Sequence, residues 1–177
     1  MKFQETPLKG AWIITPEPIE DERGFFARMF CANEFENRGL KKNLAQCSIS
    51  YNRKKGTLRG MHFQASPHAE AKLVTCIKGA IYDVIVDMRV ESPTYMQWAA
   101  FELDENKQQG LYIPEGCAHG FQTLLDECKI MYMISEFYYP ESTRGFRWDD
   151  PVIGIQWPET ADRIISEKDC SWLGFPK

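Results

Sequence analysis

Two of the three histidines in the sequence lie in settings that could support proton transfer. His62 follows Arg59 by three residues in a β-like segment that also contains Gly60. His119 comes after a Pro/Gly turn at the start of an apolar strand, and the third histidine is His68. Because imidazole gains and loses a proton near neutral pH, either ring could act as a general base. For any single ring, a hydrogen-bonded structural role near a barrel mouth is the more common explanation.

A metal site is a second interpretation of these histidines. Imidazole ligands with an open coordination position would suit iron, zinc or manganese. The available set of His62, Glu70 and His119 has no recognised spacing, and Gln64 stands where a second histidine would strengthen the pattern. The sequence therefore favours a site without a metal.

Basic side chains could hold an anionic ligand. Arg23, Arg59 and Lys72 are candidates, because an arginine can bind two phosphate oxygens at once. A lysine that borders a strand is more often a solvated edge charge. Arg59 and His62 are an odd number of residues apart, so a regular strand would point them to opposite faces unless Gly60 allows a bulge.

Three further side chains have two explanations each. Tyr132 and Tyr138 lie an even number of residues apart in one β-like run, so they could share a strand face, although core packing would give the same pattern. Asp169 would by default be a surface carboxylate. These residues alone do not decide between a proton-transfer site and an ordinary β-rich core.

Short β-like runs separated by turn residues must position these side chains. Helical periodicity is scarce, and the best candidate follows Asn33, where Glu36 resembles the second member of a capping box and Gly39 ends the helix. Many short strands without alternating helices predict a closed or double-sheet antiparallel architecture, and a jelly roll fits the length. The expected strands are 73–77, 81–87, 95–103, 111–113, 120–124 and 130–138, with the first two joined at Gly79.

The composition is that of one globular domain, which we expect to span residues 1–177. The mass of 20.5 kDa suits a single core, and 44% apolar with 26% charged residues argues against disorder. A net charge of −4 gives no general attraction to nucleic acid or to an anionic membrane, so a local basic cluster must hold any anion. The absence of a secretory signal, a transmembrane run and a C-x-x-C pair predicts a cytoplasmic protein with free thiols.

Several segments, by their order and spacing, resemble the dTDP-4-dehydrorhamnose 3,5-epimerase family over nearly the whole chain. They are DERGFF at 21–26, TLRGMHFQ at 57–64, AKLV at 71–74, IPEGCAHGF at 113–121, RGFRWDDP at 144–151 and ISEKD at 165–169. The resemblance implies a cupin-like jelly roll (double-stranded β-helix) with short peripheral helices, acting as a homodimer without metal or organic cofactor. It also implies a nucleotide diphospho-4-keto-6-deoxy sugar as substrate, by default dTDP-4-dehydro-6-deoxyglucose, with inversion of the carbons beside the ketone.

The resemblance assigns catalytic roles to four positions. His62 matches the base that removes a proton beside the ketone, and Asp169 matches the carboxylate that orients its ring. Lys72 matches the cation near the ketone oxygen, where it would stabilise an enolate. Tyr132 matches the acid that returns a proton from the opposite face.

The resemblance also implies a substrate-binding set. Arg23, Arg59 and His119 match pocket positions, with the arginines at the diphosphate. Phe26 and Tyr138 match aromatic residues that sandwich the base. Pairing of the N-terminal segments across a homodimer would place Arg23 or Phe26 in the partner's pocket.

Arg28, Gln46 and Ser48 fall on further substrate-binding positions of the family, and several pocket positions depart from the family pattern. Arg28 stands where a glutamate is usual, Ser48 replaces the asparagine that follows Gln46 by two residues, and Thr143 and Met133 replace an acidic residue and a lysine. Because a guanidinium has only donors, Arg28 cannot accept a hydrogen bond from a base N–H, which puts thymidine in doubt. The alternatives are a GDP- or CDP-linked sugar, a 6-deoxyheptose, or inversion of carbon 3 alone.

Two other classes of protein fit part of the pattern. One is a metal-dependent cupin enzyme such as an oxygenase, and the other is a sugar- or nucleotide-binding module without catalysis. Binding alone needs no base and acid on opposite faces, so the set of His62, Lys72, Tyr132 and Asp169 favours an enzyme.

Overall fold

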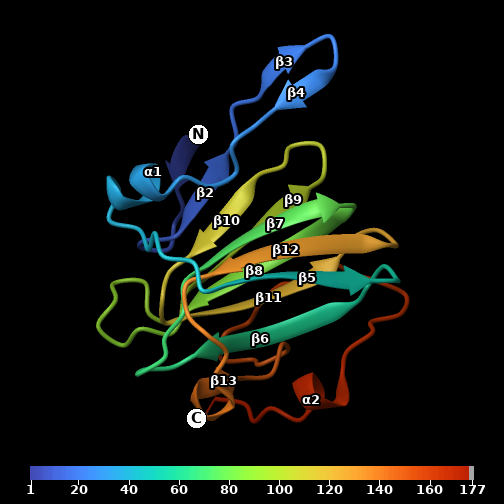
Figure 1. The fold of residues 1–177 in the computed structure, drawn as a ribbon. Helices are drawn as coiled ribbons and strands as arrows, with labels where there is room; N and C mark the ends of the chain where they lie inside the picture. The colour runs from blue at the N-terminus through green and yellow to red at the C-terminus, as the bar shows by residue number, and fades with distance from the viewer. Residues whose placement is uncertain (176–177) are drawn as a thin grey trace.

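Two antiparallel sheets form the body of the protein (Figure 1). The structure is a computed structural model that describes residues 1–175. The six-stranded sheet has the spatial order β1–β2–β10–β7–β12–β5, and the five-stranded sheet has the order β13–β6–β11–β8–β9. The first comprises β1 (Lys2–Glu5), β2 (Trp12–Thr15), β5 (Gln46–Asn52), β7 (Lys72–Lys78), β10 (Gly110–Ile113) and β12 (Cys128–Ile134). The second comprises β6 (Leu58–Gln64), β8 (Ala80–Asp87), β9 (Trp98–Asp104), β11 (Cys117–Thr123) and β13 (Thr143–Gly145).

Short helices and a separate hairpin complete the fold. The helices are α1 (Ala32–Glu36), the 3-10 helix η1 (Pro140–Ser142) and α2 (Glu167–Cys170), and β3 (Ile19–Asp21) pairs only with β4 (Gly24–Phe26) among the described strands. Within residues 1–175, no helix is long and apolar enough to cross a bilayer. The prediction of an all-β jelly roll with short peripheral helices is confirmed.

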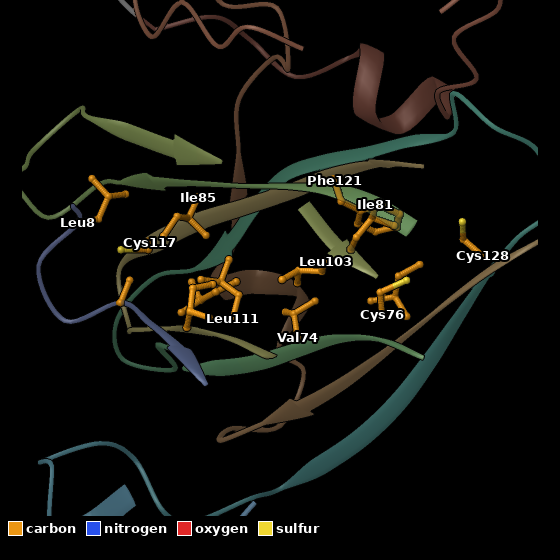
Figure 2. Packing of buried hydrophobic residues seen from close by; sticks show 14 residues of the cluster. Leu8, Val74, Cys76, Ile81, Ile85, Leu103, Leu111, Cys117, Phe121 and Cys128 are labelled. Carbon is orange, nitrogen blue, oxygen red and sulfur yellow. The ribbon is translucent and has the colours of Figure 1, made fainter. Parts of the chain in front are cut away.

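The main core lies between the two sheets (Figure 2). Ile85 of β8, Leu103 of β9 and Phe121 of β11 come from the five-stranded sheet, and Val74 of β7 and Leu111 of β10 come from the other. Each of these side chains is at most 1% exposed. Burial of one such side chain contributes about 1.5–3 kcal/mol, so this cluster holds the two sheets together.

The outer faces of both sheets are also covered. Val84 and Ala118 pack with Phe146 and Ile153 of the C-terminal segment, and Phe35 of α1 packs with residues of the six-stranded sheet. Central strands such as β8 and β11 are therefore buried on both faces. For this reason the apolar residues of β8 form a nearly continuous run instead of alternating with polar ones.

The predicted junction at Gly79 is confirmed, and it is the point at which the chain changes sheets. β7 ends just before it in the six-stranded sheet, and β8 begins just after it in the five-stranded sheet. Gly79 has a φ of 82°, and a Cβ there would lie 2.6 Å from the Sγ atom of Cys128. Only glycine fits this corner without strain.

Three local predictions were wrong. The strand expected from residue 95 begins at Trp98, because the preceding residues form turns. β12 ends before Tyr138, so this tyrosine lies in a loop and does not share a strand face with Tyr132. Helix α1 begins after Cys31, and Asn33 lies inside it instead of capping it; the N-cap makes no side-chain hydrogen bond.

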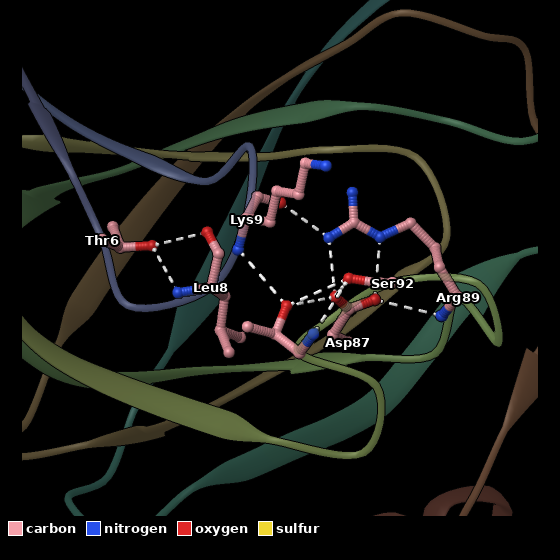
Figure 3. A network of polar contacts seen from close by, with 7 residues as sticks. Thr6, Leu8, Lys9, Asp87, Arg89 and Ser92 are labelled. Atoms are coloured by element: carbon pink, nitrogen blue, oxygen red, sulfur yellow. Dashed lines mark hydrogen bonds and ion pairs between the residues drawn. The ribbon is translucent and has the colours of Figure 1, made fainter.

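A buried carboxylate anchors the loop that follows β8 (Figure 3). The side chain of Asp87 has no exposed surface, and it accepts hydrogen bonds from Nε and Nη2 of Arg89, each at 2.7 Å. The hydroxyl groups of Ser92 and Thr94 donate to the same carboxylate. Arg89 also donates to the carbonyl oxygen of Lys9, so the cluster ties the N-terminal loop to the end of the barrel.

Candidate active site

A pocket of about 430 Å³ lies between the two sheets. Strands β5, β7 and β12 supply one wall, β6 and β11 supply the other, and the segment around α2 closes one side. Nine of the twelve predicted site residues line this pocket: Gln46, Ser48, Arg59, His62, Lys72, His119, Tyr132, Tyr138 and Asp169. The fold thus brings together residues that are more than one hundred positions apart in the sequence.

The predicted base and its carboxylate are in direct contact. Nε2 of His62 lies 2.6 Å from Oδ1 of Asp169, and the backbone N–H of Gly60 donates to Oδ2 at 3.3 Å. Asp169 is positioned by α2, where its backbone N–H donates to the N-cap hydroxyl of Ser166. Within residues 1–175, Nδ1 of His62 has no hydrogen-bond partner, and the ring is one-third exposed to the pocket. Nδ1 is therefore the nitrogen available to take a proton.

The carboxylate of Asp169 keeps its negative charge despite burial. Burial raises the pKa of Asp169, but the hydrogen bond and the charge of His62 lower it, and so do the hydrogen bonds from Gly60 and Ser166. The net effect is a pKa below the ordinary aspartate value. An ionised carboxylate holds the imidazole in one orientation and stabilises the imidazolium that forms when a proton is taken.

A bulge in β6 places Arg59 and His62 in the same pocket. His62 pairs with His119 on β11, whereas Arg59 pairs with Phe121, so three residue steps on β6 face two on β11. Gly60 makes the bulge possible because a Cβ there would lie 2.6 Å from the Cα of Gly120. The bulge that the sequence allowed at Gly60 is confirmed.

Lys72 forms an ion pair inside the pocket. Its Nζ lies 2.6 Å from Oε1 of Glu70, and the two side chains are only 14% and 10% exposed. From the sequence, Glu70 was considered only as a possible metal ligand, and its ion pair with Lys72 was not predicted. Their spacing of two residues, which puts side chains on one face of an extended chain, was the available signal.

His119 has a carboxylate partner that the sequence did not predict. Nε2 of His119 lies 2.6 Å from Oδ1 of Asp83 on β8, and both residues are buried. The other oxygen of Asp83 has no partner among the described residues. The signal in the sequence was Asp83 itself, a charged residue inside an apolar run. A buried carboxylate requires a hydrogen-bond donor, so a partner was to be expected.

Tyr132 remains protonated in this environment. Burial raises the pKa of its phenol, and the charge of Asp83 raises it further, which together outweigh the opposing effects of Arg59 and Ser50. Tyr132 belongs to the six-stranded sheet and His62 to the five-stranded sheet. A ring bound between the sheets would therefore meet a base on one side and a proton donor on the other.

Because the protein carries a net negative charge, it needs a local basic cluster to hold an anion, and the pocket contains one. Arg59 and Lys72 line it, and so does Lys168, which the sequence missed although it directly precedes Asp169. Nε of Arg59 donates to the side-chain oxygen of Asn52 at 2.8 Å, which leaves its terminal nitrogens for a ligand. The pocket can hold an anion in a protein that is acidic overall.

The three residues proposed as metal ligands have other partners. His62 contacts Asp169, Glu70 contacts Lys72, and His119 contacts Asp83, as described above. Residues 1–175 contain no group of three His, Cys, Asp or Glu side chains placed to hold a metal ion.

Three predicted binding residues lie outside the pocket of their own chain. Arg23 and Phe26 belong to the β3–β4 hairpin, which extends away from the sheets, and Arg28 follows it in an exposed position (Figure 1). Phe26 is 71% exposed, and Ile19 on the paired strand is 72% exposed. A hairpin with such exposed apolar side chains has the character of a surface that another molecule covers.

Comparison with known proteins gives one consistent result. The sequence matches the family model described as dTDP-4-dehydrorhamnose 3,5-epimerase over residues 5–176. A protein of that name from Methanothermobacter thermautotrophicus is 45% identical over 173 residues, which cover 97% of this chain and 92% of its own length.

Solved structures agree with the sequence comparison. The crystal structure of dTDP-4-dehydrorhamnose 3,5-epimerase from Elizabethkingia anophelis has a TM-score of 0.95 and 39% identity, and the match covers 99% of this chain and 96% of that one. A dTDP-6-deoxy-D-glucose-3,5-epimerase from Legionella pneumophila, solved in complex with dTDP-4-keto-L-rhamnose, has a TM-score of 0.92 and 34% identity. That match covers 98% of this chain and 92% of the other.

Proposed function

Because this chain belongs to the dTDP-4-dehydrorhamnose 3,5-epimerase family of isomerases, we propose that it converts dTDP-4-dehydro-6-deoxyglucose to dTDP-4-dehydrorhamnose. It does so by inverting carbons 3 and 5, which flank the ketone at carbon 4. The observation that carries the proposal is the contact between His62 and Asp169 in a pocket that also contains Lys72 and Tyr132.

Proton removal begins at His62. Nδ1 of the imidazole takes the hydrogen of the carbon beside the ketone as a proton, and the electron pair of that C–H bond moves to the ketone oxygen to form an enolate. Asp169 stabilises the resulting imidazolium through its 2.6 Å contact with Nε2. Lys72 lies at the enolate oxygen, and Glu70 holds its ammonium group in place.

Proton return comes from the opposite sheet. Tyr132 donates its phenolic proton to the carbon that lost one, the enolate electrons return to that carbon, and the C=O bond re-forms. Because the proton leaves on one face and returns on the other, the configuration is inverted. His62 then loses its proton and Tyr132 regains one, and the same cycle operates at the second carbon.

The diphosphate and the base occupy the outer part of the pocket. Arg59 binds diphosphate oxygens with its free terminal nitrogens, and Tyr138 stacks on the base at the pocket rim. In a homodimer, the β3–β4 hairpin of one subunit would bring Arg23 and Phe26 to the partner's pocket. The exposed apolar residues of the hairpin support this arrangement, and Phe26 would then face Tyr138 across the base.

Two broader properties complete the proposal. The enzyme forms one domain over residues 1–177 and acts as a homodimer in the cytoplasm, where its six cysteines remain free thiols. The family relationship favours dTDP, although Arg28 lacks the acceptor that the usual glutamate provides.

A competition assay tests the proposed substrate. Equal amounts of dTDP-, GDP- and CDP-linked 4-keto-6-deoxy sugars are incubated with the enzyme, and product configuration at carbons 3 and 5 is read by NMR. We expect conversion of the dTDP sugar first, with both carbons inverted. Preferential conversion of a GDP or CDP sugar would refute the choice of nucleotide, and inversion of carbon 3 alone would refute the double inversion.

A further inference from the structure

A single buried amide joins the two loops that form one rim of the pocket. Gln64 is the last residue of β6 and is 2% exposed. Its Nε2 donates to the carbonyl oxygens of His68 and Phe137, each at 3.0 Å, and its Oε1 accepts from the backbone N–H of Tyr139 at 2.6 Å. Both donors and the acceptor of one side chain are thus used to hold main-chain groups of loops 65–71 and 135–139.

These contacts fix the main chain on both sides of Tyr138. The carbonyl of Phe137 belongs to the peptide unit before Tyr138, and the N–H of Tyr139 belongs to the unit after it. The side chain of Tyr138 is 57% exposed, so packing within the protomer does little to fix it. The position of its ring therefore depends on the main chain that Gln64 holds.

Two further contacts show that the loops act together. At their base, Ala71 and Ser135 exchange hydrogen bonds, from the Ala71 N–H to the Ser135 hydroxyl at 2.8 Å and from the Ser135 N–H to the Ala71 carbonyl at 3.0 Å. Near their tips, the ring of His68 stacks on Tyr139 with centroids 3.5 Å apart. Gln64 lies between these two contacts, and its side chain binds three partly buried main-chain groups there.

We propose that Gln64 is a positioning residue for nucleotide recognition, which presets Tyr138 to stack on the base. This inference rests on the proposed function, because it needs a nucleoside diphosphate as the ligand. Without Gln64, three main-chain groups would lose their partners, and the loop would open toward water to satisfy them. The base would then lose a prepared stacking surface, whereas the diphosphate would keep Arg59.

The test compares binding of dTDP with binding of inorganic diphosphate by calorimetry. In Gln64→Met, which keeps the chain length and removes all three hydrogen bonds, dTDP affinity should fall about tenfold, within the range that base–aromatic stacking contributes. Diphosphate affinity should change less than about twofold. In steady-state kinetics of Gln64→Met, KM should rise while kcat stays within about threefold of the wild type, because Gln64 does not touch the reacting atoms.

A matched control and a second variant make the test specific. Gln122 on β11 is also buried, donates to the carbonyl of Pro158 and accepts from Arg163, but it lies outside the pocket. Gln122→Met should leave both affinities unchanged. Gln64→Glu keeps the acceptor for Tyr139 and places an oxygen against two carbonyls, so it should weaken dTDP binding even if Gln64→Met does not fold.

A double-mutant comparison decides whether Gln64 acts through Tyr138. If it does, Gln64→Met combined with Tyr138→Ala should bind dTDP no more weakly than Tyr138→Ala alone. Equal dTDP affinity in Gln64→Met and the wild type, an equal loss for dTDP and diphosphate, or additive losses in the double variant would each overturn the inference. If the wild type binds no dTDP, the proposed function itself fails. If the wild type binds dTDP and Gln64→Met binds it equally well, only the inference about Gln64 fails.

Discussion

Replacing Asp87 with asparagine should destabilise the fold at neutral pH and lose most of that effect in acid. Asp87 has no exposed surface, and its carboxylate accepts hydrogen bonds from Arg89, Ser92 and Thr94. Asparagine keeps the shape but cannot carry the negative charge that faces Arg89. The guanidinium of Arg89 would then remain without the carboxylate that pairs with it.

The magnitude follows from the pKa of Asp87. Burial raises this pKa, but hydrogen bonds from the side chains of Arg89, Ser92 and Thr94 and from the Arg89 N–H lower it, and the result is about 2 against an ordinary value of 3.8. Each pKa unit corresponds to about 1.4 kcal/mol, so ionised Asp87 contributes about 2 kcal/mol to the free energy of unfolding. For a chain of this length, that corresponds to a Tm lower by about 4–8 °C.

The sign of the pH dependence is fixed by the lowered pKa. The stabilisation is fully present above about pH 5, where the carboxylate is ionised even in the unfolded chain, and it is lost as the pH falls toward 2. Urea unfolding of the wild type and Asp87→Asn at several pH values, at one protein concentration, measures the difference directly. Asp162→Asn, at an exposed carboxylate, is the matched control.

We expect a difference of about 2 kcal/mol at pH 7 that shrinks steadily below about pH 5. The reasoning would be refuted by a difference near zero at pH 7. A difference that stays constant down to pH 2 would also refute it, because the effect would then come from packing and not from charge.

Three further substitutions test the site itself. Asp169→Asn should lower kcat by about 10²–10³-fold with little change in KM, because the imidazole loses the charge that stabilises its protonated form; steady-state kinetics would show it, and an unchanged kcat would contradict the role. Lys72→Gln should lower kcat by about 10²-fold or more while dTDP affinity, measured by calorimetry, stays near the wild-type value. Arg28→Glu should increase the preference for dTDP over GDP in the competition assay, since it restores an acceptor, and no change would mean that position 28 does not face the base.

The architecture could be predicted from the sequence because short apolar runs and turn residues determine it locally. The corner at Gly79 and the bulge at Gly60 were both expected from single glycines, and both occur where a side chain would collide with a neighbouring strand. The end of β12 was expected too late, because Phe137 and Tyr138 add apolar residues after Ser135 and Glu136. The strand ends at Ile134, and Gln64 binds the main chain of the loop that follows.

The site was predictable only in part, since its contacts join distant segments. The resemblance identified His62 and Asp169 as partners, and the structure places them 2.6 Å apart. It did not identify Asp83 or Glu70, which support His119 and Lys72 from inside the fold. Contacts of this kind depend on strand register, which a pattern of residue types does not contain.

Entry of solvent deuterium at carbons 3 and 5 of the sugar, followed by NMR in D₂O, tests the central claim most directly. The wild type should label both positions and His62→Ala neither, because His62 is assigned as the base that removes the proton at both carbons. Tyr132→Phe should still incorporate some deuterium at carbons 3 and 5 while failing to complete the inversion. Labelling at the wild-type rate in His62→Ala, or complete loss of labelling in both variants alike, would contradict the assignment of His62 as the base and Tyr132 as the acid.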